Sequence, residues 1–188
     1  MIHSIRSLGL QWGIQWNSLY KRISYQILTR KLFRIRNGVF SDVPLKKLKQ
    51  DDIMSLVAQS ERPGYLSFET ILTISGINSQ YTDTWYVATP KHSRHALIES
   101  LDIDIMLQYL PEEIFYNQLG IIHEDGYSRA SRERAIADTL GRSPLYHFDV
   151  IPGDLDLVLL TSIGELWKDI SPKAYTRIMK ICLSLGNL

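Results

Sequence analysis

The sequence has one cysteine, Cys182, no long apolar run, and almost no negative charge in its first quarter. A single cysteine excludes an internal disulfide, which is typical of proteins in a reducing cytoplasm. No apolar run approaches the roughly 18 residues that a transmembrane helix requires. The first sixteen residues contain neither an apolar core nor a small-residue cleavage site. We therefore expect no signal peptide, a cytoplasmic location and no membrane partner.

The scarcity of acids is confined to one segment. Residues 1–50 contain ten Lys/Arg and one acid, Asp42, whereas residues 51–188 contain eleven Lys/Arg and nineteen acids. The formal charge of the whole chain is only +1, so the total hides this split. A basic segment joined to an acidic one is typical of a polyanion-binding domain attached to a domain with another task. We predict one domain at residues 1–45 and a second at residues 50–188.

Residues 16–30, WNSLYKRISYQILTR, have the periodicity of an amphipathic helix. Its apolar positions form one stripe: Trp16, Leu19, Tyr20, Ile23 and Ile27. The opposite side carries hydrogen-bonding side chains and no carboxylate: Ser18, Arg22, Tyr25, Gln26 and Thr29. Lys21 flanks this side, and Arg30 ends the segment. Such a surface suits a helix in the major groove of DNA, because Arg and Gln recognise base edges and Ser, Thr and Tyr contact phosphates. A shorter helix ending near Gly13 is expected before it, in helix-turn-helix order.

Residues 33–40 predict a β-hairpin. The dipeptide Asn37-Gly38 favours a two-residue type I′ turn, in which both central residues have positive φ. Regular pairing across this turn places Phe33, Ile35 and Phe40 on an apolar face toward the core. It places Arg34 and Arg36 on a basic outer face. Two outward arginines beside Asn37 can contact phosphates or enter a minor groove. The hairpin would then be the wing of a winged helix-turn-helix.

An ordinary amphipathic helix and hairpin with a solvated basic surface would produce the same local patterns. The order of the two elements and the concentration of charge favour binding to double-stranded DNA.

Residues 50–188 predict a small mixed α/β domain, so the expected fold class of the whole chain is α+β. Alternation of apolar and polar residues predicts strands, and periodicity near 3.6 predicts helices. The strands are expected at residues 84–89 and 100–107 and on both sides of a turn at 124–126. The helices are expected at residues 67–76, 131–141, 154–167 and 172–185, with Ser67 and Ser131 as caps and Gly141 closing the second one.

The sequence contains few candidates for chemistry. His92 and His95 lie among cations that repel a metal ion. Asp102 and Asp104 have the spacing of two acids on one strand face, which could hold Mg²⁺ in a nucleotidyltransferase. A second pair, Asp154 and Asp156, falls in the first turn of an expected helix, where acids are common dipole partners. We expect no catalytic residue, metal, cofactor or small-molecule substrate, and keep a Mg²⁺-dependent nucleotidyltransferase as an alternative.

Four stretches in succession resemble the AbiEi family of antitoxins from bacterial toxin–antitoxin systems of phage defence. They are LFRIRNGVF, RPGYLSFETILTISGI, WYVATP and YSRASRERAIADTLG, and the resemblance covers about residues 18–170. It implies an N-terminal winged helix-turn-helix that represses its own operon and an antitoxin domain that counteracts a nucleotidyltransferase-like toxin. The segment before Asn17 is short, which implies an abbreviated DNA-binding domain.

By the same resemblance, the helix with Arg22, Tyr25 and Gln26 and the wing with Arg34 and Arg36 correspond to the DNA-contacting part. Residues 131–135 correspond to a family signature, which we interpret as a helix start with Glu133 in its first turn and not as a site. A stand-alone winged-helix regulator without a toxin partner is the alternative within the same class of function.

Overall fold

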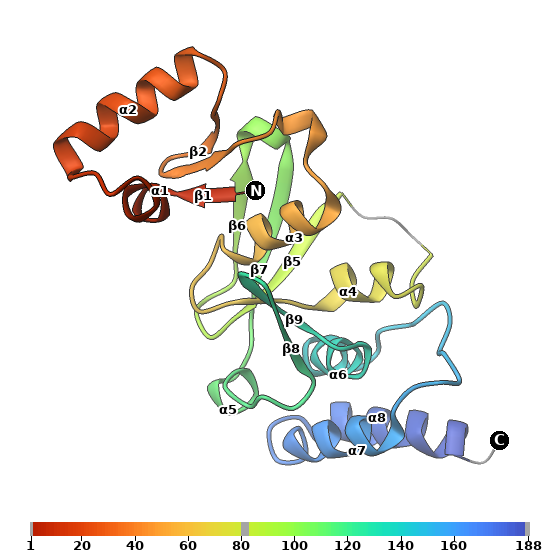
Figure 1. Cartoon of the computed structure of the whole chain (residues 1–188). Coiled ribbons are helices and arrows are strands. Elements are labelled where there is room, and N and C mark those ends of the chain that lie inside the picture. Colours follow the sequence, from red (N-terminus) through yellow and green to blue (C-terminus); the bar gives the residue numbers. More distant parts are fainter. Residues whose placement is uncertain (1, 80–82, 187–188) are drawn as a thin grey trace. The chain divides into compact units, whose positions relative to one another are not determined.

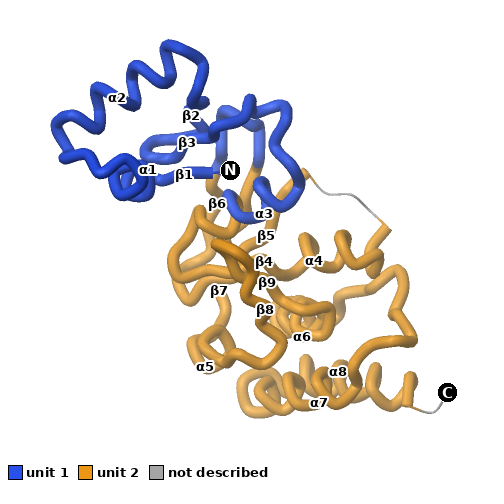
Figure 2. The backbone as a smooth tube through the Cα atoms, in the orientation of Figure 1, with its two compact units in different colours: residues 1–56, 97–103 blue, residues 57–96, 104–188 orange. Residues whose placement is uncertain are grey.

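The chain has a mixed α/β fold, seen in a computed structural model that describes residues 2–79 and 83–186 (Figure 1). It divides into two compact units (Figure 2). Unit 1 comprises residues 1–56 and 97–103, and unit 2 comprises residues 57–96 and 104–188. Unit 1 contains the predicted segment 1–45 and extends beyond it. No helix in the described part of the chain is long and apolar enough to cross a bilayer.

Unit 1 combines two helices with a small antiparallel sheet. Its elements follow in the order β1 (Ile2–Ser4), α1 (Ile5–Trp12), α2 (Trp16–Leu28), β2 (Phe33–Arg36), β3 (Val39–Ser41) and α3 (Gln50–Ala58), the last of which continues into unit 2. The sheet has the order β1-β3-β2, so the last strand of the three lies between the other two. The predicted helix at 16–30 and the shorter helix before it are confirmed.

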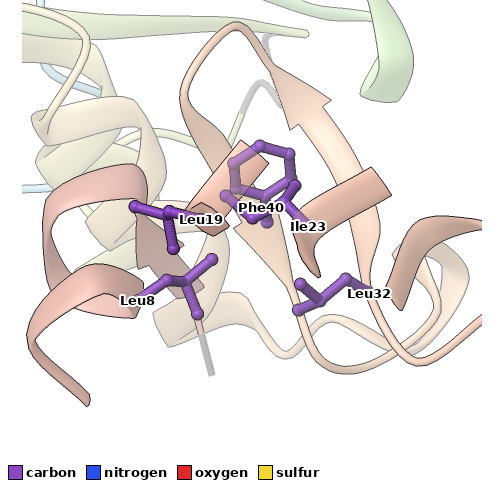
Figure 3. Close-up of a cluster of buried hydrophobic side chains, with 5 residues drawn as sticks. All are labelled: Leu8, Leu19, Ile23, Leu32 and Phe40. Atoms are coloured by element: carbon purple, nitrogen blue, oxygen red, sulfur yellow. The ribbon is translucent and has the colours of Figure 1, made fainter. Parts of the chain in front are cut away.

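A small apolar cluster holds these elements together (Figure 3). It contains Leu8 from α1, Leu19 and Ile23 from α2, Leu32 from the segment before β2 and Phe40 from β3, all at most 5% exposed. Burial of five such side chains stabilises the unit by an amount on the order of 10 kcal/mol before the conformational entropy of ordering the chain is subtracted. The cluster therefore fixes how α2 and the hairpin are presented.

The turn of the β2–β3 hairpin differs from the predicted type. Gly38 has a φ of 78°, but Asn37 is not among the described non-glycine residues with positive φ. A type I′ turn needs positive φ at both central positions, so that prediction is wrong. The ladder has a bulge between Arg34 and Arg36, and the additional residue changes how β2 enters the turn.

The bulge also changes which hairpin side chains share a face. Phe40 pairs with Arg34, whereas regular pairing would have placed Ile35 opposite it. A shift of one residue moves a side chain to the other face of a strand. The prediction that Phe33, Ile35 and Phe40 face the core is nonetheless confirmed in part, because Ile35 and Phe40 are buried, Phe33 is half-buried and Arg34 is exposed. The carbonyl of Ile35 accepts a 2.6 Å hydrogen bond from Ser100 Oγ.

A mixed sheet in the order β6-β7-β5-β4-β9-β8 forms the framework of unit 2. Its strands are β4 (Tyr65–Leu66), β5 (Thr84–Thr89), β6 (Arg94–Ile98), β7 (Ile103–Tyr109), β8 (Ile121–Glu124) and β9 (Tyr127–Ala130). β5 and β7 are parallel, as are β4 and β9, while β4–β5 and β8–β9 are antiparallel. The strand predicted at 84–89 is confirmed, and the strand predicted at 100–107 begins three residues later, at Ile103.

The helices of unit 2 are α4 (Phe68–Ile74), α5 (Glu112–Phe115), α6 (Arg132–Arg142), α7 (Leu157–Leu166) and α8 (Pro172–Gly186). α4 and α6 pack together, and α7 and α8 pack against α6 and against each other (Figure 1). Ser131 caps α6 as predicted, because its Oγ accepts a hydrogen bond from Arg134 N. Ser67 precedes α4 but makes no capping hydrogen bond through its side chain.

Gly141 does not close α6, which continues to Arg142. It serves the packing of α6 against Trp167, whose ring lies so close that a Cβ atom at position 141 would sit 2.1 Å from Cη2. Trp167 is only 2% exposed and has little room to move. Gly141 is therefore needed for the close approach of Trp167 and not for ending α6.

Gly141→Ala should lower the free energy of unfolding by about 3 kcal/mol, because the added methyl group forces the buried Trp167 ring out of place. Urea denaturation measures the effect. Gly153→Ala is the matched control, since nothing lies within 4 Å of the place that its new methyl group would occupy. The stability of this control should stay within about 0.5 kcal/mol of wild type. Equal stability of the two variants would contradict the packing role of Gly141.

Candidate nucleic-acid interface

The candidate interface is built on α1, α2 and the hairpin of unit 1. Ser4 and Ser7 form a reciprocal cap at the start of α1, with Ser4 Oγ accepting from Ser7 N at 3.0 Å. Gly13 ends α1 in the left-handed conformation with a φ of 63°, which residues with a side chain adopt at a penalty. Only three residues separate the two helices. The short turn sets the direction in which α2 leaves α1.

Most of the predicted contact residues lie at the surface. Eight of the ten are exposed: Ser18, Lys21, Arg22, Tyr25, Thr29, Arg30, Arg34 and Asn37. Gln26 and Arg36 are half-buried. Apart from Gln26, the polar side of α2 is thus presented to solvent.

The predicted apolar stripe of α2 is only partly buried. Leu19 and Ile23 are buried, but Trp16 and Tyr20 are 58% and 54% exposed. Their rings lie 6.3 Å apart and form an aromatic flank beside the polar face. Both aromatics belong to the predicted apolar stripe, but no described element of unit 1 covers them. Aromatic side chains next to cations are frequent where proteins bind nucleic acid.

Several polar side chains are oriented by contacts inside unit 1. The Arg22 guanidinium lies 4.8 Å from the centre of the Trp12 ring, a cation–π contact that steadies it on α1. Thr29 Oγ1 donates to the carbonyl of Tyr25, which closes the last turn of α2. In the hairpin, Arg34 Nη2 donates to Asn37 Oδ1 at 2.8 Å, so the guanidinium and the amide are held side by side.

Five exposed cations of this surface have no carboxylate partner in the described part of the chain: Lys21, Arg22, Arg30, Lys31 and Arg34. Residues 16–41 contain no Asp or Glu, so no neighbour within this stretch can pair with them. The acid that follows this stretch, Asp42, has its Oδ2 3.5 Å from His3 Nε2. Cations that lack an internal counter-ion keep their full attraction for an external polyanion.

The chain was compared with known proteins. No family model matches it, and the search of curated proteins gives no match.

The first acidic pair considered for chemistry does not form a cation site. Asp102 lies in the turn before β7 with a φ of 51°, so it does not share a strand face with Asp104 and that prediction is wrong. Asp104 instead accepts a hydrogen bond from Thr84 Oγ1. The two acids therefore have separate structural roles.

The second acidic pair is also divided between two structural contacts. Asp154 forms an ion pair with Arg132, while Asp156 caps α7 by accepting a hydrogen bond from Leu159 N at 2.9 Å. The prediction that both acids fall in the first turn of a helix is wrong, because α7 begins at Leu157, Asp156 is its N-cap and Asp154 lies before it. Among the described residues, no three His, Cys, Asp or Glu side chains gather closely enough to hold a metal ion.

The sequence did not reveal a buried polar network in unit 2. Arg134, in the stretch interpreted as a helix start, is fully buried and pairs with the equally buried Asp138, with 2.8 Å between Nε and Oδ1. The remaining guanidinium N–H groups donate to the Tyr65 hydroxyl and to three carbonyls, those of Ile114, Asn117 and Leu119. The only sequence signal is the spacing of four residues between the Arg and the Asp, which is common on solvent-exposed helices.

The carboxylate of Asp138 also accepts hydrogen bonds from several partners. Its Oδ2 accepts from Tyr65 Oη at 3.0 Å and from Ser67 Oγ at 2.8 Å, so Ser67 serves this carboxylate in place of the predicted cap. Burial raises the pKa of Tyr65, and the negative charge of Asp138 adds to that rise. Burial by itself lowers the pKa of Arg134, but the Asp138 carboxylate outweighs it and the net pKa is raised. Arg134 therefore keeps its positive charge inside the fold.

Arg134→Met should lower the free energy of unfolding by about 3–5 kcal/mol, because it leaves the Asp138 carboxylate buried without its counter-ion. Arg132→Met, two positions earlier in the same helix, breaks the more exposed pair with Asp154 and should cost at most about 1 kcal/mol. Chemical denaturation of both variants provides the measurement. Similar losses in the two would show that the buried network is not a main source of stability.

The raised pKa of Tyr65 predicts a loss of stability in alkali. Tyrosine in the unfolded chain ionises near pH 10.0, while Tyr65 in the folded chain keeps its proton to higher pH. The stability that the folded chain gains from the raised pKa of Tyr65 is complete below pH 10 and is lost as the pH rises beyond it. Tyr65→Phe should be about 1–3 kcal/mol less stable than wild type at pH 8. This difference in stability should narrow above pH 10 by up to about 1.4 kcal/mol per pH unit. Urea titrations at pH 8 and above pH 10 measure it. A difference that is the same under both conditions would refute the assignment.

Proposed function

We propose that the chain is a cytoplasmic DNA-binding repressor of the AbiEi antitoxin type. In this proposal, α2 and the β2–β3 hairpin of unit 1 bind operator DNA, and unit 2 counteracts a nucleotidyltransferase-like toxin. The observation that carries the DNA-binding part is the set of five exposed cations on α2, on the hairpin and in the turn between them that lack a carboxylate partner in the described part of the chain. No covalent chemistry is required of the protein.

The order of elements in unit 1 supports the assignment of a winged helix-turn-helix. One strand precedes two helices joined by a short turn, a hairpin follows them, and the sheet has the order β1-β3-β2. A winged helix has this arrangement after a further helix, so the elements of unit 1 correspond to its part from the first strand onward. In such a domain α2 occupies the position of the recognition helix, and the β2–β3 hairpin occupies that of the wing.

In the proposed complex, α2 and the hairpin make different contacts with DNA. Lys21, Tyr25 and Ser18 lie on the exposed side of α2, where a helix in the major groove approaches the bases and the phosphate backbone. Arg34, held beside Asn37, lies on the hairpin, where contacts to phosphate or to the minor groove are made. Polycation–phosphate attraction supplies most of the affinity, and α2 supplies the register on DNA.

The antitoxin part of the proposal is supported by the four stretches that resemble AbiEi antitoxins. The last of them, YSRASRERAIADTLG, forms β9 and α6 and contains the buried Arg134 and Asp138. This stretch supplies the structural centre of unit 2, as expected of a stretch that characterises a family by its fold.

Gel-shift titrations of the full chain with the DNA upstream of its own gene test the DNA-binding proposal. For about five phosphate contacts, the slope of log K against log salt should be near −4 to −5. Lys21→Gln with Arg34→Gln should reduce its magnitude by about two units. The charge-matched control Arg62→Gln with Lys168→Gln, which removes two cations from unit 2, should leave the slope unchanged. A wild-type slope near −1 would overturn the proposal.

Co-expression with the neighbouring open reading frame tests the antitoxin part. Growth that is inhibited by the neighbour and rescued by this protein supports it. If the neighbour is harmless while the operator is still bound, the protein is a stand-alone winged-helix regulator.

A further inference from the structure

We propose that a groove between α8 and the segment joining α6 to α7 binds an acidic, apolar-faced segment of a partner protein. The groove lies entirely within unit 2. DNA binding by unit 1 is not required for it, so the gel-shift experiment above and the experiment below can fail independently.

One side of the groove is cationic. Lys173, Arg177 and Lys180 recur on α8 at spacings of four and three residues, which places them on one flank of the helix. Residues 172–186 contain no Asp or Glu, and none of the three cations has an ion pair within the described part of the chain. Arg177 and Lys180 line the groove together with His147 from the opposite side.

The floor of the groove is apolar. It is formed by Phe148 and Ile151 from the connecting segment and by Ile181 from α8. Ile181 is buried, and the other two are half-buried. Apolar surface beside cations that lack an internal counter-ion favours a ligand that offers both apolar side chains and carboxylates.

Contacts away from the groove hold its walls in place. The Tyr146 hydroxyl accepts a 2.6 Å hydrogen bond from Asn78 Nδ2, and Val150 N donates to the carbonyl of Ile77 at 3.0 Å. Asp149, the acid in this segment, accepts two hydrogen bonds from Ser79 and does not line the groove. A site that is already ordered loses less conformational entropy when a ligand binds.

These features favour a protein segment over a nucleic acid. A phosphate backbone gains nothing from the apolar floor, and unit 2 contains fifteen acids against eleven Lys/Arg, which repel an extended polyanion. An amphipathic helix with acids at i, i+4 and i+7 matches the spacing of the cations on α8. Its apolar stripe would contact Phe148 and Ile151.

Fluorescence polarisation with the full chain tests the inference. The probe is a short fluorescein-labelled helical peptide in which Glu recurs at i, i+4 and i+7 beside a Leu stripe. Arg177→Gln with Lys180→Gln should weaken its binding about tenfold, because two of the cations that face the carboxylates are lost. Ser184→Trp should also weaken binding, since it fills the groove without changing its charge.

The control variant Arg62→Gln with Lys168→Gln removes the same charge elsewhere in unit 2 and should bind the peptide within about twofold of wild type. Circular dichroism melting curves establish that all variants are folded. Three results would each overturn the inference: no binding of the peptide by wild type, equal weakening in the groove and control variants, or equal binding of a peptide with Gln in place of Glu. Tighter binding of a single-stranded oligouridylate that the groove variants abolish would also overturn it, because the partner would then be a nucleic acid.

Discussion

The ion pair between Arg134 and Asp138 is the interaction on which unit 2 depends. It joins α6 to β4 through Tyr65, to the residue before α4 through Ser67, and to the segment after α5 through backbone carbonyls. Removing two charges from water is unfavourable, and the penalty is offset only because every N–H of the guanidinium and both carboxylate oxygens find partners. The network therefore connects elements of unit 2 that are far apart in the sequence.

Unit 1 depends on a small apolar cluster. Five apolar side chains hold two helices and a hairpin together, and a bulge of one residue in β2 decides which hairpin residues enter that cluster. Phe40 packs inside, and Arg34 stays exposed beside Asn37. A unit of this size leaves part of its apolar surface uncovered, as the exposed rings of Trp16 and Tyr20 show. The exposed rings lie on the same helix as the cations of α2. The small size of the core therefore also decides which apolar side chains belong to the candidate interface.

The pairing of charges separates structural cations from available ones. In unit 2, Arg129, Arg132, Arg134 and Arg142 all have carboxylate partners. The cations of α2 and of α8 have none in the described part of the chain. The first group belongs to the fold, and the second remains available to external anions, which is why one of these surfaces supports the proposed function and the other supports the further inference. Net charge alone would have concealed the second, since it lies in the acidic part of the sequence.

What the sequence by itself determined is everything that depends on local spacing: the helix at Trp16–Leu28, the strand at Thr84–Thr89, the cap at Ser131 and the carboxylate-free face of α2. Tertiary structure alone decided the features that depend on distant partners. Tyr65 and Arg134 are 69 residues apart, so nothing near Arg134 indicates that it is buried. The bulge in β2 and the exposure of Trp16 were also decided there, because register and burial depend on what packs against a strand or helix and not on its own periodicity.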